Sequence, residues 1–123
     1  MIGYTTLGTN DIARAAAFYD ALFAEMGAKR LMQFGENFIG YGVDMQQPMF
    51  CICKPYDGAA AARGNGNMIA LAAKNSEQAA RLHAKALSLG GTDEGAPGKR
   101  GEAFYCAYVR DLDGNKLNFF CML

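Results

Sequence analysis

Residues 109–120, VRDLDGNKLNFF, contain a turn between two β-rich segments, and this arrangement decides the fold of the chain. Asp111, Asp113 and Gly114 are typical turn residues, because aspartate side chains bond nearby backbone N–H groups and glycine adopts positive φ. The flanking residues are rich in aromatic and aliphatic types, as strands are. The stretch therefore predicts strands over 102–110 and 115–123, joined by a turn at 111–114.

The residues before this hairpin predict a strand, a helix and one further strand. Residues 67–74, NMIALAAK, have strand character, and Ser76 is a plausible helix cap. A helical apolar stripe then ends at the glycine pair 90–91 and consists of Ala79, Leu82, Ala86 and Leu89. A weaker strand is predicted at 92–97, and residues 95–105 are predicted to form a glycine-rich loop. The order is β-α-β-β-β.

The first half of the chain repeats that order. Residues 2–9 predict a strand, Asn10 a helix cap, Asp11 a negative charge in the first turn, and Gly27 the helix stop. Three strand candidates follow at 28–34, 37–43 and 48–54. Each half alone is too small to bury its sheet well. We therefore predict one α+β domain over 1–123, with module 1 at 1–54, a linker at 55–66 and module 2 at 67–123.

The composition argues against nucleic-acid and membrane partners. Twelve basic residues balance twelve acidic ones, and no basic cluster exceeds Lys99-Arg100. No apolar run could span a bilayer, and the start lacks the features of a signal peptide. We expect a cytoplasmic protein whose four cysteines are reduced core thiols, with Cys106 and Cys121 facing each other on adjacent strands.

Three segments carry a resemblance to a known family: TLGTNDIARAAAFYDALF at 6–23, GNGNMIALAAKN at 64–75 and VRDLDGNKLNFF at 109–120. With them the chain resembles the vicinal oxygen chelate superfamily, which includes glyoxalase I, bleomycin-resistance proteins and extradiol dioxygenases. The resemblance implies two βαβββ modules forming a paired eight-stranded, cleft-like sheet, usually in a homodimer. It also implies metal ligands, usually His and Glu, on the first and last strands of each module.

Carried over to this chain, those ligand positions fall on Tyr4, Cys51, Met68 and Asn118. None of them is a histidine or a carboxylate, whereas divalent ions need at least three imidazole or anionic ligands. We therefore expect no metal and no other cofactor. The Lewis acid and the carboxylate base of glyoxalase I chemistry are missing from these positions. His83, the only histidine, is expected on the surface of the second helix.

Side chains two residues apart on a strand share a face, so the neighbours of these positions predict a ligand pocket. The face is aromatic and rich in sulfur, which suits varied apolar ligands. Its predicted residues are Tyr4, Thr6, Met49, Cys51, Cys53, Met68, Ala70, Lys116, Asn118 and Phe120. Lys54, Tyr56 and Arg100 are predicted on the rim. Cys51 and Cys53 lack a histidine partner, so we expect no catalytic cysteine.

Three functions are compatible with this pattern. The favoured one is a metal-free, bleomycin-resistance-like protein that binds a small, largely apolar molecule. The second is a glyoxalase-type lyase or isomerase that acts on a small carbonyl compound or glutathione adduct. The third is a structural module whose cleft is packed shut.

Overall fold

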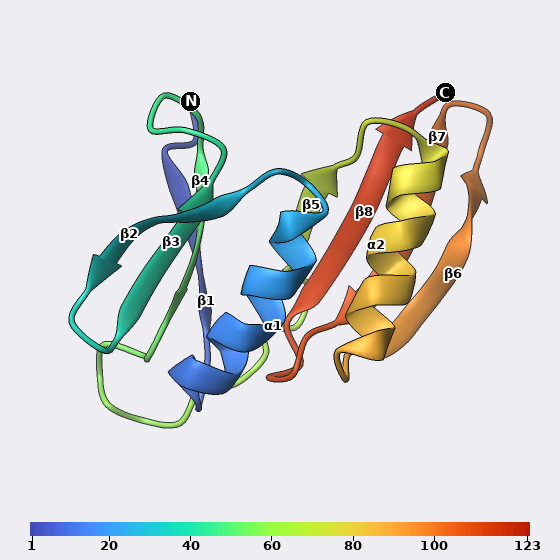
Figure 1. Ribbon diagram of the computed structural model, residues 1–123. Coiled ribbons are helices and arrows are strands. Elements are labelled where there is room, and N and C mark those ends of the chain that lie inside the picture. Colours follow the sequence, from blue (N-terminus) through green and yellow to red (C-terminus); the bar gives the residue numbers. More distant parts are fainter. The chain divides into compact units, whose positions relative to one another are not determined.

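The computed structural model describes residues 1–123, which form two helices and eight strands (Figure 1). The chain divides into two compact units, unit 1 at Met1–Arg63 and unit 2 at Gly64–Leu123. Each unit has the order β-α-β-β-β and one four-stranded mixed sheet. The predicted α+β class with two βαβββ modules is confirmed.

Unit 1 contains β1 (Tyr4–Gly8), α1 (Ile12–Ala24), β2 (Lys29–Phe34), β3 (Phe38–Gly42) and β4 (Met49–Cys53). Its strand order is β1-β4-β3-β2, with β1 parallel to β4 and the other neighbours antiparallel. Unit 2 contains β5 (Ile69–Ala72), α2 (Ser76–Ser88), β6 (Thr92–Arg100), β7 (Phe104–Arg110) and β8 (Lys116–Met122). The order β5-β8-β7-β6 repeats that of unit 1. Neither helix is long and apolar enough to cross a membrane.

One face of each sheet is covered by the helix of its own unit. In unit 1, Tyr19 and Phe23 of α1 pack on Phe50, with ring centroids 4.8 and 5.0 Å away, and Tyr41 lies beside them. In unit 2, apolar residues of α2 pack against apolar residues of β7 and β8. These residues are Ala79, Leu82, Ala86, Val109, Leu117 and Phe119. Burying these apolar side chains stabilises each helix on its sheet and leaves the opposite sheet face open within the unit.

Both helices begin one residue away from the predicted cap. The Asp11 side chain accepts a bond from the Arg14 N–H at 3.0 Å, so Asp11 caps α1. Asn75, and not Ser76, caps α2 by accepting from the Gln78 N–H at 2.9 Å. In both helices the capping residue is the one whose backbone is extended. The amino-acid composition does not locate that residue to a single position, because several polar residues adjoin each helix start.

Asn10, the predicted cap of α1, has a different role. Its side chain accepts a hydrogen bond from the Ala61 N–H at 2.6 Å and donates one to the Ala61 carbonyl at 3.1 Å. Residue 61 lies in the predicted linker, which has no helix or strand. These two bonds hold that segment against the start of α1.

The predicted loop at 95–105 is mostly strand. β6 continues to Arg100, only residues 101–103 form the turn, and β7 begins at Phe104. The register shifts around Gly95 and Gly98, as it does at β-bulges. A Cβ on Gly95 would lie 2.9 Å from the Tyr108 ring, so the glycine permits a close approach that makes this strand look like a loop in the sequence.

His83 is buried, and the prediction of a surface histidine was wrong. Its Nε2 lies 2.9 Å from Oδ1 of Asp93 in β6. This hydrogen bond, together with one from the Gly95 N–H, lowers the pKa of the Asp93 carboxyl. The buried imidazole therefore joins α2 to an exposed carboxylate on β6.

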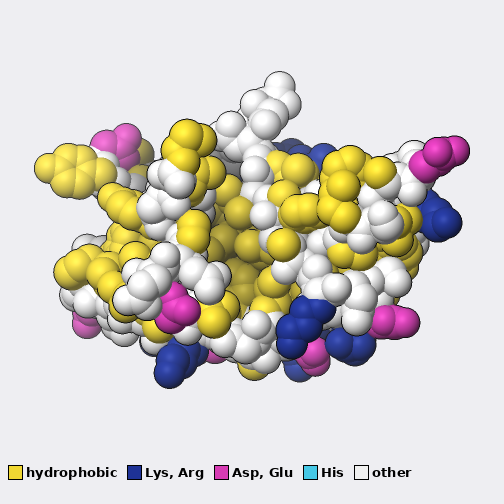
Figure 2. All heavy atoms as spheres, turned by 90° about the horizontal axis from the view of Figure 1, so that it is seen from above, with side chains coloured by type: hydrophobic (Ala, Val, Ile, Leu, Met, Phe, Trp, Pro, Cys, Tyr) yellow, Lys and Arg dark blue, Asp and Glu magenta, His cyan; other side chains and the backbone are white.

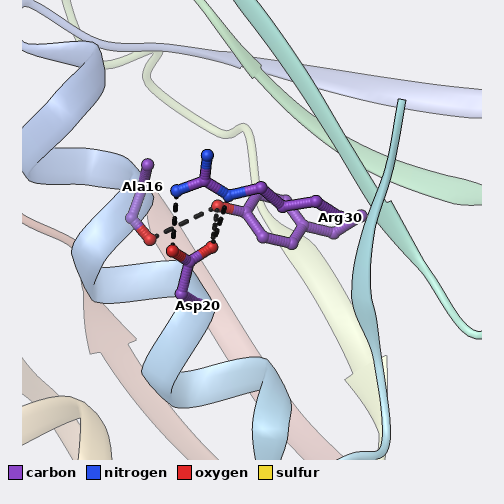
Figure 3. Close-up of polar contacts among 4 residues, drawn as sticks. Ala16, Asp20 and Arg30 are labelled. Carbon is purple, nitrogen blue, oxygen red and sulfur yellow. Dashed lines mark hydrogen bonds and ion pairs between the residues drawn. The ribbon is translucent and has the colours of Figure 1, made fainter. Parts of the chain in front are cut away.

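A three-residue polar cluster joins α1 to β2 and β3 (Figure 3). Arg30 donates to both oxygens of Asp20, with Nε–Oδ1 and Nη2–Oδ2 distances of 2.8 and 2.7 Å. The Tyr41 hydroxyl donates to Oδ1 of Asp20 at 2.8 Å and lies 3.3 Å from the Ala16 carbonyl. The bond from Arg30 is the main reason why the pKa of Asp20 is lowered.

We expect the Asp20→Asn variant to lose about 1 kcal/mol of stability at neutral pH, a modest figure because the pair is partly solvent-exposed. The native pKa of this carboxyl is below its unfolded value of about 3.9. Its contribution is therefore fully present above that value and is lost as the pH falls through the native pKa. Urea unfolding at neutral and at acid pH measures it. If the free energies of unfolding of wild type and variant differed by the same amount at neutral and at acid pH, this role of Asp20 would be contradicted.

Candidate functional site

The open face of the unit 1 sheet is rich in sulfur. Gly40 lies at its centre, and a Cβ placed there would be 3.3 Å from Sγ of Cys51 and 3.5 Å from Sδ of Met49. Met32 lies on the other side of this glycine at 3.6 Å. The sequence predicted Met49, Cys51 and Cys53 on this face but missed Met32, because β2 carries none of the inferred ligand positions.

Tyr4 and Thr6 lie on the same open face and are exposed. Tyr4 is paired with Met49, and Thr6 with Cys51, in the parallel β1–β4 register. The Tyr4 ring makes an edge contact with Phe38, with centroids 6.5 Å apart. A bond from Thr6 to the Cys53 thiol partly offsets the effect of burial, which raises the pKa of Cys53. Figure 2 shows many hydrophobic side chains in its view, intermixed with uncharged polar side chains and backbone.

Asn118 lies near the middle of the open face of the unit 2 sheet. Its cross-strand neighbours are Tyr108 on β7 and Ala70 on β5. The side chain is 93% buried, since 7% of it is exposed, and its Oδ1 has no hydrogen-bond partner. Buried acceptors are satisfied in the great majority of cases. An unpartnered amide oxygen on a sheet face is therefore a feature that a ligand could complete.

Two cations flank the ring of Tyr108. The Nζ of Lys116 is 5.3 Å from the ring centroid, and the guanidinium carbon of Arg100 is 5.7 Å from it. The pKa of Tyr108 is raised, mainly by a hydrogen bond with the Cys106 thiol. The sequence prediction included Lys116 and Arg100 but missed Tyr108 and Cys106, because it considered only the four strands that carry ligand positions. Side chains alternate between the two faces along the strand predicted at 102–110, and this alternation could have placed Cys106 and Tyr108 on one face.

The predicted rim residues lie in different environments. Arg100 is the last residue of β6, and Tyr56 is fully exposed. Lys54 lines two shallow grooves of unit 1, with volumes of about 220 and 460 Å³. The smaller groove is lined by Thr9, Asn10, Lys54, Pro55, Gly58, Ala59 and Ala60. The larger is lined by Ile12, Ala13, Ala16, Arg30, Gln33, Glu36, Ile39 and Lys54. Neither groove contains any of the predicted pocket residues on the strands.

The family model of the Glyoxalase/Bleomycin resistance protein/Dioxygenase superfamily matches residues 1–119. The chain belongs to this superfamily. A glyoxalase/bleomycin resistance protein from Albidiferax ferrireducens T118 is 34% identical, with a TM-score of 0.87 over 98% of this chain and 97% of that one.

Two further solved structures are similar to the chain in fold. A glyoxalase/bleomycin resistance protein/dioxygenase family enzyme from Burkholderia phytofirmans PsJN is 19% identical, with a TM-score of 0.79 over 98% of both chains. A lactoylglutathione lyase from Agrobacterium tumefaciens is 16% identical, with a TM-score of 0.71 over 98% of this chain and 92% of that one. No curated protein matches the chain.

The residues at the metal-ligand positions expected from the resemblance do not have the chemistry that a divalent metal prefers. Tyr4 and Met68 are exposed, and Met68 lies just before β5 begins. They offer a neutral phenol and a thioether, and Asn118 offers an uncharged amide oxygen. No group of three or more His, Cys, Asp or Glu side chains lies close enough together to bind a metal. A zinc, nickel or iron ion would therefore lack the anionic and imidazole donors that it prefers.

The cysteines are not arranged for nucleophilic chemistry. Burial raises the pKa of the Cys51 thiol to about 11, so it is protonated at neutral pH. Cys106 is paired with Phe120, and Cys121 with Tyr105, in the β7–β8 register. Neighbouring positions point to opposite faces, so Cys106 and Cys121 do not face each other as predicted. All four cysteines are free.

Proposed function

We propose that this chain is a metal-free member of the superfamily that binds a small, largely apolar molecule at the open faces of its sheets. The observation that carries the proposal is Asn118, a buried amide with an unpartnered oxygen at a position where the superfamily places a metal ligand. The amide cannot supply the charge that a metal requires, but it can accept a hydrogen bond from an organic ligand.

The surroundings of Asn118 support a ligand of mixed character. Ala70 beside it is small and exposed, which leaves room on that side. Within unit 2, the Tyr108 ring on the neighbouring strand adds an aromatic surface beside Asn118. On the sheet of unit 1, methionine and cysteine side chains provide a separate adaptable apolar surface. The site residues proposed are those predicted from the sequence, with Met32, Cys106 and Tyr108 added.

The assembly and location are proposed on the resemblance and the composition. We propose a cytoplasmic homodimer, with no nucleic-acid or membrane partner, in which residues 55–66 join two modules of one domain. Light scattering with size-exclusion chromatography measures the assembly. A monomer at micromolar concentration would contradict the dimer without affecting the ligand proposal.

A fluorescent apolar amine, N-phenyl-2-naphthylamine, tests the binding proposal. We expect saturable binding by the purified chain, and a loss of about tenfold in affinity for Ala70→Phe, because the added ring occupies the space beside Asn118. Ala84→Phe on the exposed face of α2 is the matched control and should bind as wild type does. Absence of saturable binding, or equal effects of the two substitutions, would overturn the proposal.

A further inference from the structure

The open face of unit 2 contains an arrangement of charge that an apolar ligand would not use. Lys116 and Arg100 both lie over the ring of Tyr108, at 5.3 and 5.7 Å from its centroid. Neither cation is paired with a carboxylate. By contrast, Arg110 on the same face donates to Glu94 at 2.5 Å. Two cations without anionic partners are therefore present at one aromatic ring.

The guanidinium of Arg100 is held in place by the backbone of its own hairpin. It donates to the carbonyls of Ala96 at 2.8 Å and Lys99 at 3.3 Å. A Cβ on Gly98 would be 3.2 Å from Nη1 and one on Gly95 would be 3.5 Å from Nη2, so both glycines leave the space that the group occupies. A cation fixed in this way loses little freedom when it binds an anion.

The unpartnered oxygen of Asn118 completes the arrangement. Asn118 is paired directly with Tyr108, and Lys116 is two residues before Asn118 on the same strand face. Residues in such positions are separated by about 5–7 Å. One small molecule can therefore reach both the cations and the amide oxygen.

We propose that the ligand of this site is a small organic anion, whose charged oxygens are bound by Lys116 and Arg100 while an N–H or O–H group donates to Asn118. The inference rests on the proposed function and specifies the chemical class of its ligand. The apolar body of the molecule lies against Tyr108 and the neighbouring side chains. Charge-assisted bonds select the anion, and the otherwise unsatisfied acceptor selects a donor.

Two related probes separate this inference from the general binding proposal. 2-Anilinonaphthalene-6-sulfonate has an apolar body, an N–H donor and a distant sulfonate, whereas N-phenyl-2-naphthylamine lacks only the sulfonate. We expect the sulfonate probe to bind about tenfold more tightly than the neutral amine, because it makes one additional charge-assisted contact. Lys116→Met and Arg100→Gln should each remove most of that preference, measured in each variant as the ratio of the affinities for the two probes.

The matched control is Lys99→Met, which removes the same charge from the strand face opposite Arg100. It should leave both affinities within about twofold, since exposed charges are screened by salt. Near-ultraviolet circular dichroism must match wild type for each variant, because such dyes also bind partly unfolded chains.

The outcomes distinguish the two proposals. Equal affinity for both probes, or equal effects of Lys99→Met and Lys116→Met, would overturn the anion inference while the binding proposal stands. Failure of both probes to bind would overturn the binding proposal and the inference with it. A preference for the sulfonate that disappears in Lys116→Met and Arg100→Gln alone supports the inference.

Discussion

The Asp111→Ala variant is expected to lose about 3 kcal/mol of stability, because it removes several hydrogen bonds and leaves their partly buried partners unsatisfied. Oδ1 of Asp111 accepts from the backbone N–H groups of Asp113 and Asn115 at 2.9 and 2.8 Å. Oδ2 accepts from the Asn115 side chain at 3.0 Å. The Asp111 side chain is buried, so water cannot replace these bonds fully.

Urea unfolding of Asp111→Ala measures this effect, and Asp57→Ala is the control. Asp57 accepts one similar bond, from the Ala59 N–H at 2.9 Å, but lies in an exposed segment. Its loss should cost about 0.5 kcal/mol. Equal losses in the two variants would show that burial of the 111–115 turn adds nothing. Because this turn sets the β7–β8 register, Asp111→Ala should also weaken ligand binding at Asn118.

The Asn118→Leu variant is expected to gain about 1–2 kcal/mol of stability and to lose affinity for both naphthyl probes. Leucine has a similar size but no acceptor, so the desolvated oxygen without a partner is removed. The N–H of each probe then lacks its acceptor. A substitution that stabilises the fold and impairs binding is typical of a residue kept for function.

Asn115→Leu provides the matched control for Asn118→Leu. Asn115 donates through its side chain and its backbone to Asp111, so its replacement should destabilise the chain. Urea unfolding gives the free energy of unfolding of each variant, which is compared with that of wild type. Destabilisation by Asn118→Leu would mean that its amide is satisfied within the protein, contrary to the site described here.

The β-α-β-β-β order was predictable because turn residues and apolar periodicity are local signals. The turn at 111–114 follows from the two aspartates and from Gly114, which has a φ of 86°. The cap residues were missed by one position, since several polar residues adjoin each helix. β6 was partly taken for a loop, because glycines that permit close packing resemble glycines in a flexible loop.

The candidate site was less accessible from the sequence than the fold. The positions on β1, β4, β5 and β8 followed from the resemblance, but Tyr108 and Cys106 on β7 join the site only through cross-strand pairing. His83 lies four residues after Ala79 and three before Ala86, so its burial could have been predicted from helical spacing. Its bond to Asp93 required knowledge of how α2 packs on β6.

The most direct test of the central claim is the dissociation constant of N-phenyl-2-naphthylamine, measured on chelator-treated protein and again after adding zinc. We predict saturable binding without metal and the same constant with zinc, because none of Tyr4, Cys51, Met68 and Asn118 is a histidine or a carboxylate. Binding that requires zinc, or no binding in either state, would contradict the proposal of a metal-free ligand-binding protein.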